Sequence, residues 1–208
     1  MKAVILDYGE VLCYRPAPDE FRRMASIFGL SLDSYLTLWE RSRFLVDRGD
    51  LTPEAYWAKF AEETQTTITP EQVEMLCRRE IEMWSNANLT MVRWMLELSA
   101  AEIRIGLLSN MPADLAAHVQ RSFAWMNKFN FKTFSSHVGL LKPDPAIYEY
   151  TLRGLGVQPS EALFVDDRQA NVEAARALGM HGIQFQSVAQ LRNELESLGF
   201  PVLPGAAV

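Results

Sequence analysis

The sequence predicts an α/β protein: a doubly wound parallel sheet of the Rossmann-like kind, with an α-helical bundle inserted as a cap. Short apolar runs that stop abruptly at polar residues alternate with amphipathic helical stretches, which is typical of a parallel sheet covered on both faces. One long segment, residues 15–84, contains no strand pattern. The 208 residues are enough for one core domain with a large insertion.

Four apolar runs predict buried strands. They are Ala3–Leu6, 103–108, 162–165 and a weaker run at 182–185. The first three end directly before polar residues. Because ligands of open α/β sheets bind beyond the carboxyl ends of the strands, this pattern already predicts where a site lies.

Helices are expected between these strands. Apolar residues at helical spacing, N-cap residues and terminal glycines indicate helices at 90–99, 113–123, 144–155, 171–178 and 188–198. Asn88 or Thr90 is the expected N-cap of the first of them, and Gly156, Gly179 and Gly199 are expected stops. The tail from Phe200 to Val208 is expected to fray.

Residues 15–84 read as about four amphipathic helices broken near Gly29 and Gly49. Thr52-Pro53-Glu54 and Thr69-Pro70-Glu71 both have the order of an N-cap, a first-turn proline and a first-turn acid. We therefore predict a core domain made of residues 1–14 and 86–208, and a helical cap, residues 15–85, above the carboxyl ends of the strands.

Composition excludes several classes of function. A formal net charge of −6 argues against nucleic acid and anionic membranes as partners. The N-terminus has no apolar segment long enough for a signal peptide or a membrane span, and two cysteines make no disulfide framework. The sequence favours a cytoplasmic protein, a monomer or homodimer, that acts on a small molecule.

Polar residues capable of phosphoryl chemistry follow the predicted strands: Asp7, Ser109-Asn110 and Asp166-Asp167, with Lys142 before a helix. A carboxylate held at a strand end can attack phosphorus. Further carboxylates beside it need a cation, and an oxygen-only set suits Mg²⁺. Lysine would neutralise the phosphoryl oxygens. Each residue alone is more often a cap, a turn or a surface lysine, but their coincidence favours a site.

Four motifs in this order carry a family resemblance: LDYGEVL at 6–12, LLSN at 107–110, GLLKPDPAIY at 139–148 and LFVDDRQAN at 163–171. The chain resembles the phosphatases of the haloacid dehalogenase superfamily that have a helical cap after the first strand. Within it, the chain looks most like the subset related to sugar-1-phosphate phosphatases and to the phosphatase domain of soluble epoxide hydrolases.

The resemblance implies a role for each matched residue. Asp7 would be the nucleophile and would bind Mg²⁺ together with Asp167 and the backbone oxygen of Gly9. Lys142 would stabilise charge and orient Asp7.

Ser109 and the Asn110 backbone would bind the phosphoryl group of a small phosphorylated metabolite, such as a sugar phosphate. Asp166 and Asn171 would support the site without a direct bond to the metal. The expected reaction is hydrolysis of a phosphomonoester through an aspartyl phosphate.

Gly9 departs from the family pattern. Most of these phosphatases have a second aspartate two residues after the nucleophile, which acts as general acid and base and contributes about 10²–10⁴-fold. Glu10 is the nearest carboxylate, but an exposed or cap-facing position is expected for it. We therefore expect a preference for good leaving groups, such as anomeric, acyl or aryl phosphates.

Parts of this pattern also occur in proteins with other functions. A catalytically impaired member of the family, serving as a binding or regulatory protein, is an alternative because of Gly9, although a pure binder needs no nucleophile. A phosphoacceptor receiver domain would have its acidic pair first in the sequence and no helical insertion. Dehalogenases have tyrosine at the position of Gly9, so dehalogenation is not expected, and a phosphomutase would need the missing acid even more.

The cap is expected to select the substrate. Arg15, Arg41, Arg43 and Arg48 are candidates for binding an anionic group. Trp39, Trp57 and Trp84 could stack on a sugar, although ordinary helix packing is the simpler interpretation of their spacing.

Overall fold

The computed structural model describes residues 1–200 and contains one parallel sheet in that range. The strand order is β3-β2-β1-β4-β5, with every pair parallel. The bounds are β1 (Ala3–Leu6), β2 (Arg104–Ser109), β3 (Phe131–Phe134), β4 (Ala162–Asp166) and β5 (His181–Gln184). The predicted fold class is confirmed, while β3 was not predicted. Residues 201–208, most of the tail expected to fray, lie outside the described residues.

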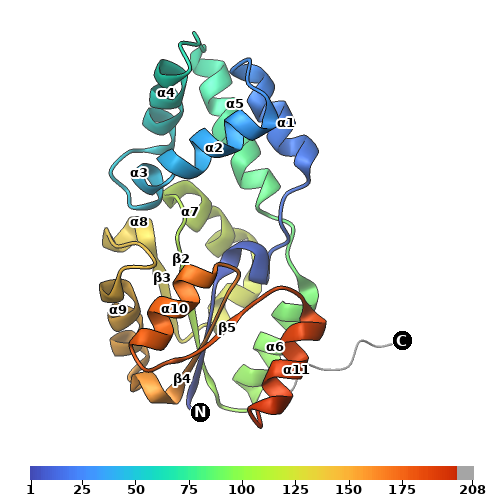
Figure 1. The fold of residues 1–208 in the computed structure, drawn as a ribbon, viewed down its shortest axis with the longest axis vertical. Helices are drawn as coiled ribbons and strands as arrows, with labels where there is room; N and C mark the ends of the chain where they lie inside the picture. Colours follow the sequence, from blue (N-terminus) through green and yellow to red (C-terminus); the bar gives the residue numbers. More distant parts are fainter. Residues whose placement is uncertain (201–208) are drawn as a thin grey trace.

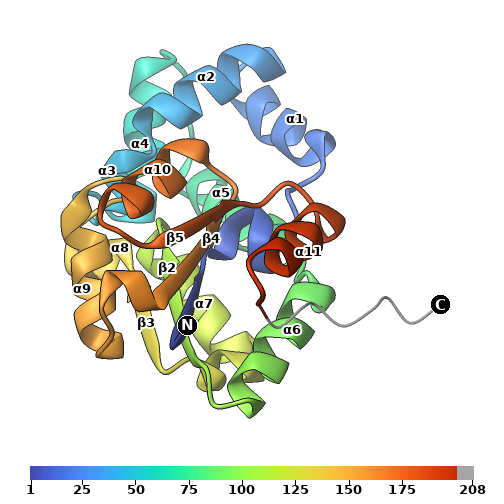
Figure 2. The same ribbon diagram turned by 60° about the horizontal axis from the view of Figure 1, so that its bottom comes forward.

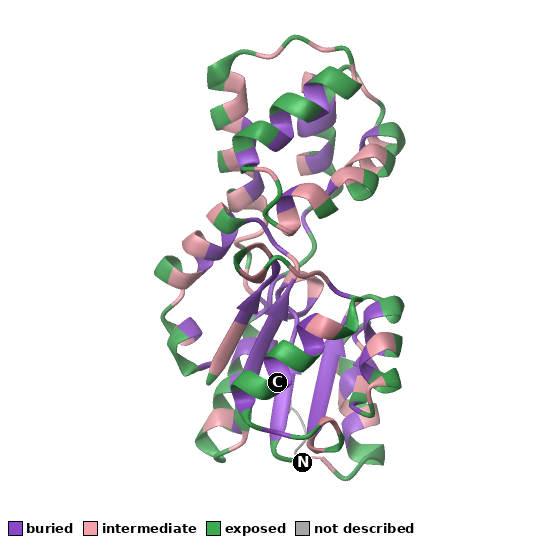
Figure 3. Cartoon of the chain, turned by 90° about the vertical axis from the view of Figure 1, so that its left-hand side faces the viewer, coloured by how far each residue is buried: buried purple, intermediate pink, exposed green. Residues whose placement is uncertain are grey.

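Helices cover both faces of the sheet (Figures 1 and 2). On one face lie α6 (Leu89–Ala100), α7 (Ala113–Ser122) and α11 (Val188–Ser197), and on the other α9 (Pro145–Leu155) and α10 (Gln169–Ala177). Alternate side chains of β1 show this division, because Val4 and Leu6 join the first apolar cluster and Ala3 and Ile5 the second. Figure 3 shows the resulting buried strands between half-exposed helices.

The predicted helix signals act as expected in the core. Asn88 caps α6 by accepting a hydrogen bond from the Met91 N–H, and Asp144 caps α9 in the same manner through Ala146. Gly156 ends α9 in the left-handed conformation, at φ 64°. Shorter elements, Ala124–Lys128, α8 (Ser135–Val138) and Pro159–Glu161, complete the connections.

The insertion forms five helices that lie beyond the carboxyl ends of the strands (Figure 1). They are α1 (Pro18–Ile27), α2 (Leu32–Ser42), α3 (Phe44–Asp47), α4 (Pro53–Glu63) and α5 (Pro70–Met83). Thr52 and Thr69 are the N-caps of α4 and α5, as their sequence context predicts. These helices bury an apolar cluster of their own, centred on the Phe28, Trp57 and Phe60 rings. We call residues 15–85 the cap; its boundaries stay a prediction.

Two adjacent segments of the chain connect the core to the cap. Cys13 and Ala87 form an antiparallel bridge, flanked by hydrogen bonds from Tyr14 N to Asn86 O (2.8 Å) and from Asn88 N to Leu12 O (2.9 Å). On the other side of the cap, the Ser135 hydroxyl donates to the Asp47 carbonyl. Gly49, at φ 86°, approaches the Ser136 carbonyl so closely that a Cβ would lie 2.7 Å from its oxygen.

Within residues 1–200, no helix combines the length and the apolar character that crossing a membrane requires.

Candidate active site

Asp7 lies immediately after β1 and is almost completely buried, at 7% exposure. Its backbone N–H donates to the Val165 carbonyl at 3.0 Å, which continues the pairing of β1 with β4. The Tyr8 N–H donates to its carboxylate Oδ1 at 2.7 Å. The sheet therefore fixes the backbone of Asp7, and the following turn fixes its side chain.

Three carboxylates meet at the ends of β1 and β4. Asp7, Asp166 and Asp167 each offer an oxygen, and these oxygens all lie within 4.8 Å of one another. Burial raises the pKa of Asp7 to about 6, with Lys142 opposing the shift and Asp166 adding to it. Burial, followed by the charges of Asp7 and Asp166, raises the pKa of Asp167 to about 7. Such a buried, mutually repulsive, oxygen-only set has the donor chemistry of a Mg²⁺ site.

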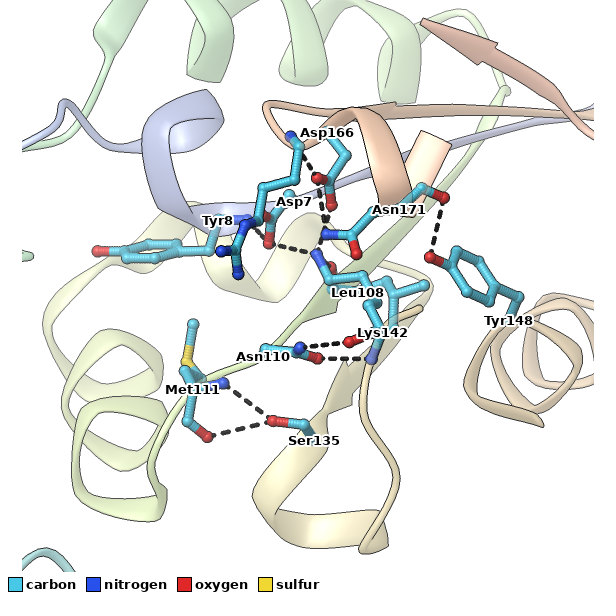
Figure 4. A network of polar contacts seen from close by, with 11 residues as sticks. Asp7, Tyr8, Leu108, Asn110, Met111, Ser135, Lys142, Tyr148, Asp166 and Asn171 are labelled. Atoms are coloured by element: carbon cyan, nitrogen blue, oxygen red, sulfur yellow. Dashed lines mark hydrogen bonds and ion pairs between the residues drawn. The ribbon is translucent and has the colours of Figure 1, made fainter. Parts of the chain in front are cut away.

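Lys142 joins two of these carboxylates (Figure 4). Its ammonium lies 2.9 Å from Asp7 Oδ1 and 2.6 Å from Asp166 Oδ2, and it also donates to the Leu108 carbonyl at 2.9 Å. Burial opposes its charge, but Asp166 and Asp7 outweigh that effect, so the pKa of Lys142 is raised. Lys142 is therefore a cation in this site.

Asp166 and Asp167 differ in their surroundings. Asp166 is fully buried, and besides Lys142 it accepts hydrogen bonds from Arg168 N at 2.8 Å and from Asn171 Nδ2 at 2.9 Å. Asp167 is half-buried and lines the cavity described below. Asp166 is thus held by protein donors, whereas Asp167 faces the space where a ligand would bind.

The two residues at the end of β2 have distinct places. Ser109 is buried at the floor of the cavity. Asn110 makes a pair of hydrogen bonds with the Lys142 backbone, through Nδ2 to Lys142 O at 3.0 Å and from Lys142 N to Oδ1 at 2.9 Å (Figure 4). The sequence predicted a role only for the Asn110 backbone; its side chain also fixes the segment that carries Lys142.

Trp84 occupies a position that the sequence did not predict. The Tyr8 hydroxyl donates to the Trp84 carbonyl at 2.7 Å. Gly9 has φ −63° and ψ 132°, which any residue adopts, and a Cβ placed on it would lie 3.7 Å from the Trp84 ring. The usual acid–base position of the family therefore faces an indole here. Gly9 and Trp84 are far apart in the sequence, so this contact follows from the folded structure and not from a sequence motif.

These residues line a cavity of about 290 Å³ between core and cap. All eight predicted site residues line it except Asp166: Asp7, Gly9, Ser109, Asn110, Lys142, Asp167 and Asn171. Arg15 and Arg43 also line it. Arg41 and Arg48 instead pair with Glu63 and Asp50 elsewhere on the cap.

Arg43 is a buried cation with its charge already paired. Its guanidinium donates to Asp47 Oδ1 at 2.8 Å and to Glu80, and it lies 5.0 Å from the centre of the Trp39 ring. Burial raises the pKa of Glu80 to about 7, although Arg43 opposes the shift. The cap therefore holds an ion cluster next to the site. Trp57 lies in the interior of the cap rather than on the cavity.

Comparison with known proteins places these features in a family. The model of the haloacid dehalogenase-like hydrolases matches residues 1–179. The sesquiterpene phosphatase AstK of Aspergillus oryzae is 26% identical, over 95% of this chain and 96% of its own length. Drimenol cyclase DrtB of Aspergillus calidoustus is 25% identical over 95% of this chain, which spans only 36% of DrtB.

A solved structure shows the same fold. HAD family enzyme bt-2542 of Bacteroides thetaiotaomicron, crystallised with magnesium and inorganic phosphate, superposes with a TM-score of 0.72 at 18% identity, covering 89% of this chain and 94% of that one. With a family match over most of the sequence, the chain belongs to the haloacid dehalogenase-like hydrolases.

Proposed function

We propose that this hydrolase cleaves phosphomonoesters of a small metabolite, with Mg²⁺ as cofactor and Asp7 as nucleophile. One observation carries the proposal: the Asp7 carboxylate lines a cavity, in contact with a buried lysine and beside an acidic pair. A nucleophilic carboxylate needs neighbouring positive charge to bring a phosphoryl group close, and Lys142 supplies part of it.

The reaction has two steps. A carboxylate oxygen of Asp7 attacks phosphorus, and the bond from phosphorus to the ester oxygen breaks. The leaving group departs as an alkoxide or aryloxide that takes a proton from solvent, and an aspartyl phosphate forms. Water then attacks the same phosphorus and loses a proton to solvent, the bond to Asp7 breaks, and inorganic phosphate is released. Ser109 and the Asn110 backbone would hold the phosphoryl oxygens, and Lys142 would stabilise their charge in both steps.

Asp7, Asp167 and the Gly9 carbonyl would hold Mg²⁺, which would neutralise charge on the phosphoryl oxygens. Asp166 and Asn171 would keep Lys142 in place through the hydrogen bonds described above. The relatives support this assignment: AstK is named a phosphatase, and the bt-2542 crystal contains magnesium and phosphate.

Gly9 supplies no proton to the departing alcohol, so leaving groups that depart without protonation should react fastest. The absence of an acid at Gly9 is also the basis of the alternative function, a binding or regulatory protein without turnover. The preserved arrangement of Asp7, Lys142 and Asp167 favours turnover over binding alone, since recognition of phosphate needs no nucleophile.

Hydrolysis of p-nitrophenyl phosphate with and without Mg²⁺ tests the proposal, with Asp7→Asn as the matched variant. We expect release of p-nitrophenol that requires Mg²⁺ and is lost in Asp7→Asn while the thermal unfolding of the variant stays cooperative. Equal activity of the two proteins, or activity unchanged by EDTA, would overturn it.

A further inference from the structure

Part of the cavity lining on the cap side is apolar, beside the charged residues Glu40, Arg43 and Asp47. Phe21, Leu36 and Trp39 come from α1 and α2 of the cap, and Trp84 closes the end of α5. From the core side, Met111, Pro112 and Leu115 continue this wall at the start of α7. The Phe21 and Trp39 rings pack edge to face at 6.0 Å, which holds this surface in shape.

From this wall we infer the substrate class: the phosphate ester of an apolar alcohol, whose hydrocarbon group lies against Phe21, Leu36 and Trp39. The inference rests on the proposed phosphatase activity and deepens it. A hydrocarbon group bound there would be removed from water and would contact side chains that need few hydrogen bonds, which favours binding.

The cations of the cavity argue against a second anionic group on the substrate. The buried ones are already paired: Arg43 with Asp47 and Glu80, and Lys142 with Asp7 and Asp166. A second phosphate or a carboxylate in this interior would have to break one of these pairs, which is costly for buried charges. The two other arginines of the lining, Arg15 and Arg168, are exposed to solvent at the rim and not in the interior.

The contact between Gly9 and Trp84 extends the apolar surface to the reacting end of the cavity. A Cβ on residue 9 would lie 3.7 Å from the Trp84 ring, in ordinary contact, so the indole borders the space beside Gly9. Hydroxyl groups of a polyol that lie against Phe21, Leu36 or Trp39 would lose hydrogen bonds to water without replacement. An apolar alcohol pays no such penalty, so the wall discriminates against sugars.

A series of n-alkyl phosphates tests this inference, with glucose 6-phosphate as the polar comparison. We expect kcat/KM to rise by up to about fourfold for each added methylene from butyl to octyl phosphate, the factor for full burial of a CH₂ group, until the cavity is filled. Glucose 6-phosphate should be hydrolysed more slowly than hexyl phosphate. No dependence on chain length, or a preference for the sugar phosphate, would overturn the inference.

A pair of variants on the same helix locates the effect. Leu36→Asn introduces a polar amide into the cavity wall, whereas Leu38→Asn makes the same change at a half-buried position that packs in the cap and does not line the cavity. Relative to Leu38→Asn, Leu36→Asn should lose about tenfold in kcat/KM for octyl phosphate. Equal losses in both variants would contradict the inference.

Acetyl phosphate tests the phosphatase activity separately from the substrate class, because its acyl group has little apolar surface to bury. Its hydrolysis should need Asp7 and Mg²⁺ and should be the same in Leu38→Asn as in the parent protein. If acetyl and p-nitrophenyl phosphate are not hydrolysed at all, the proposed function fails. If they are hydrolysed and the alkyl series is flat, only the substrate class fails.

Discussion

Lys142 and Asp166 form a salt bridge of 2.6 Å in which both side chains are almost entirely shielded from solvent, at 1% and 0% exposure. A buried ion pair of this kind contributes little net stability, but loss of one partner leaves the other charged and unpaired. Lys142 also touches Asp7. The pair therefore links the stability of the core to the position of the nucleophile.

Lys142→Met should reduce both stability and activity. Removal of the ammonium leaves Asp166 buried without its counter-ion, and we expect a loss of about 3–5 kcal/mol in the free energy of unfolding, measured by urea denaturation. The double variant Lys142→Met/Asp166→Asn removes one of the two unpaired charges, with Asp7 remaining, and should regain part of that stability but none of the phosphatase activity. A double variant no more stable than the single one would contradict this account of the pair.

Asp167→Asn should raise stability in the absence of divalent cations. The folded-state pKa of Asp167 is raised to about 7, so its contribution to stability is present at low pH and is lost as pH rises from about 4 to about 7. At pH 8 the variant avoids this loss, and we expect a gain of about 1–3 kcal/mol in the free energy of unfolding in EDTA.

The same variant tests the metal site. In the parent protein Mg²⁺ should raise the unfolding temperature, because binding to the folded state alone stabilises it. In Asp167→Asn this rise should be much smaller. An equal Mg²⁺-dependent rise in both proteins would show that Asp167 is not a ligand.

Gly9→Asp should supply the absent general acid. The backbone at Gly9 is compatible with any residue, and the added Cβ would only reach ordinary contact distance from Trp84. We expect kcat to rise by about tenfold or more for alkyl phosphates, whose alcohols need a proton to leave, and to change little for p-nitrophenyl phosphate. Gly9→Asn is the matched control, with similar size and no acid, and a similar rise in it would refute the explanation.

Glu80→Gln should flatten the pH dependence of stability. Burial raises the pKa of Glu80 from 4.5 to about 7, so the folded protein keeps a proton that the unfolded chain releases between these values. Its stabilising contribution is therefore complete below about pH 4.5 and is lost as pH rises to about 7. We expect the parent to lose about 1–3 kcal/mol more than Glu80→Gln between pH 5 and pH 7.5. Identical slopes in urea denaturation would contradict this.

The sequence predicts most of the sheet because β1, β2 and β4 are apolar runs that end at polar residues. It does not predict β3, where Lys132 and Thr133 interrupt the apolar pattern at the edge of the sheet. An edge strand is recognised by its pairing with a neighbour, here with β2, and that pairing is a property of the fold rather than of four residues.

In the candidate site, too, local motifs could be predicted from the sequence and contacts made by the fold could not. The residues in recognisable motifs, Asp7, Lys142 and Asp167, come together as the motif order predicts. The cavity wall could not be predicted, because the position of Phe21 on the cavity depends on how the cap is oriented over the core. Whether Arg43 is a free cation or a paired one depends on packing within the cap, which brings Glu80 of α5 beside it.

Because Cys13 and Ala87 form a bridge, the chain enters the cap and returns from it at neighbouring positions of the core. Seventy-odd residues can thus be exchanged, lengthened or shortened without altering the distance that the core must span at that point. The residues proposed to transfer the phosphoryl group all belong to the core. Exchange of the cap would therefore change most of the cavity wall, apart from Met111, Pro112 and Leu115, and leave those residues in place.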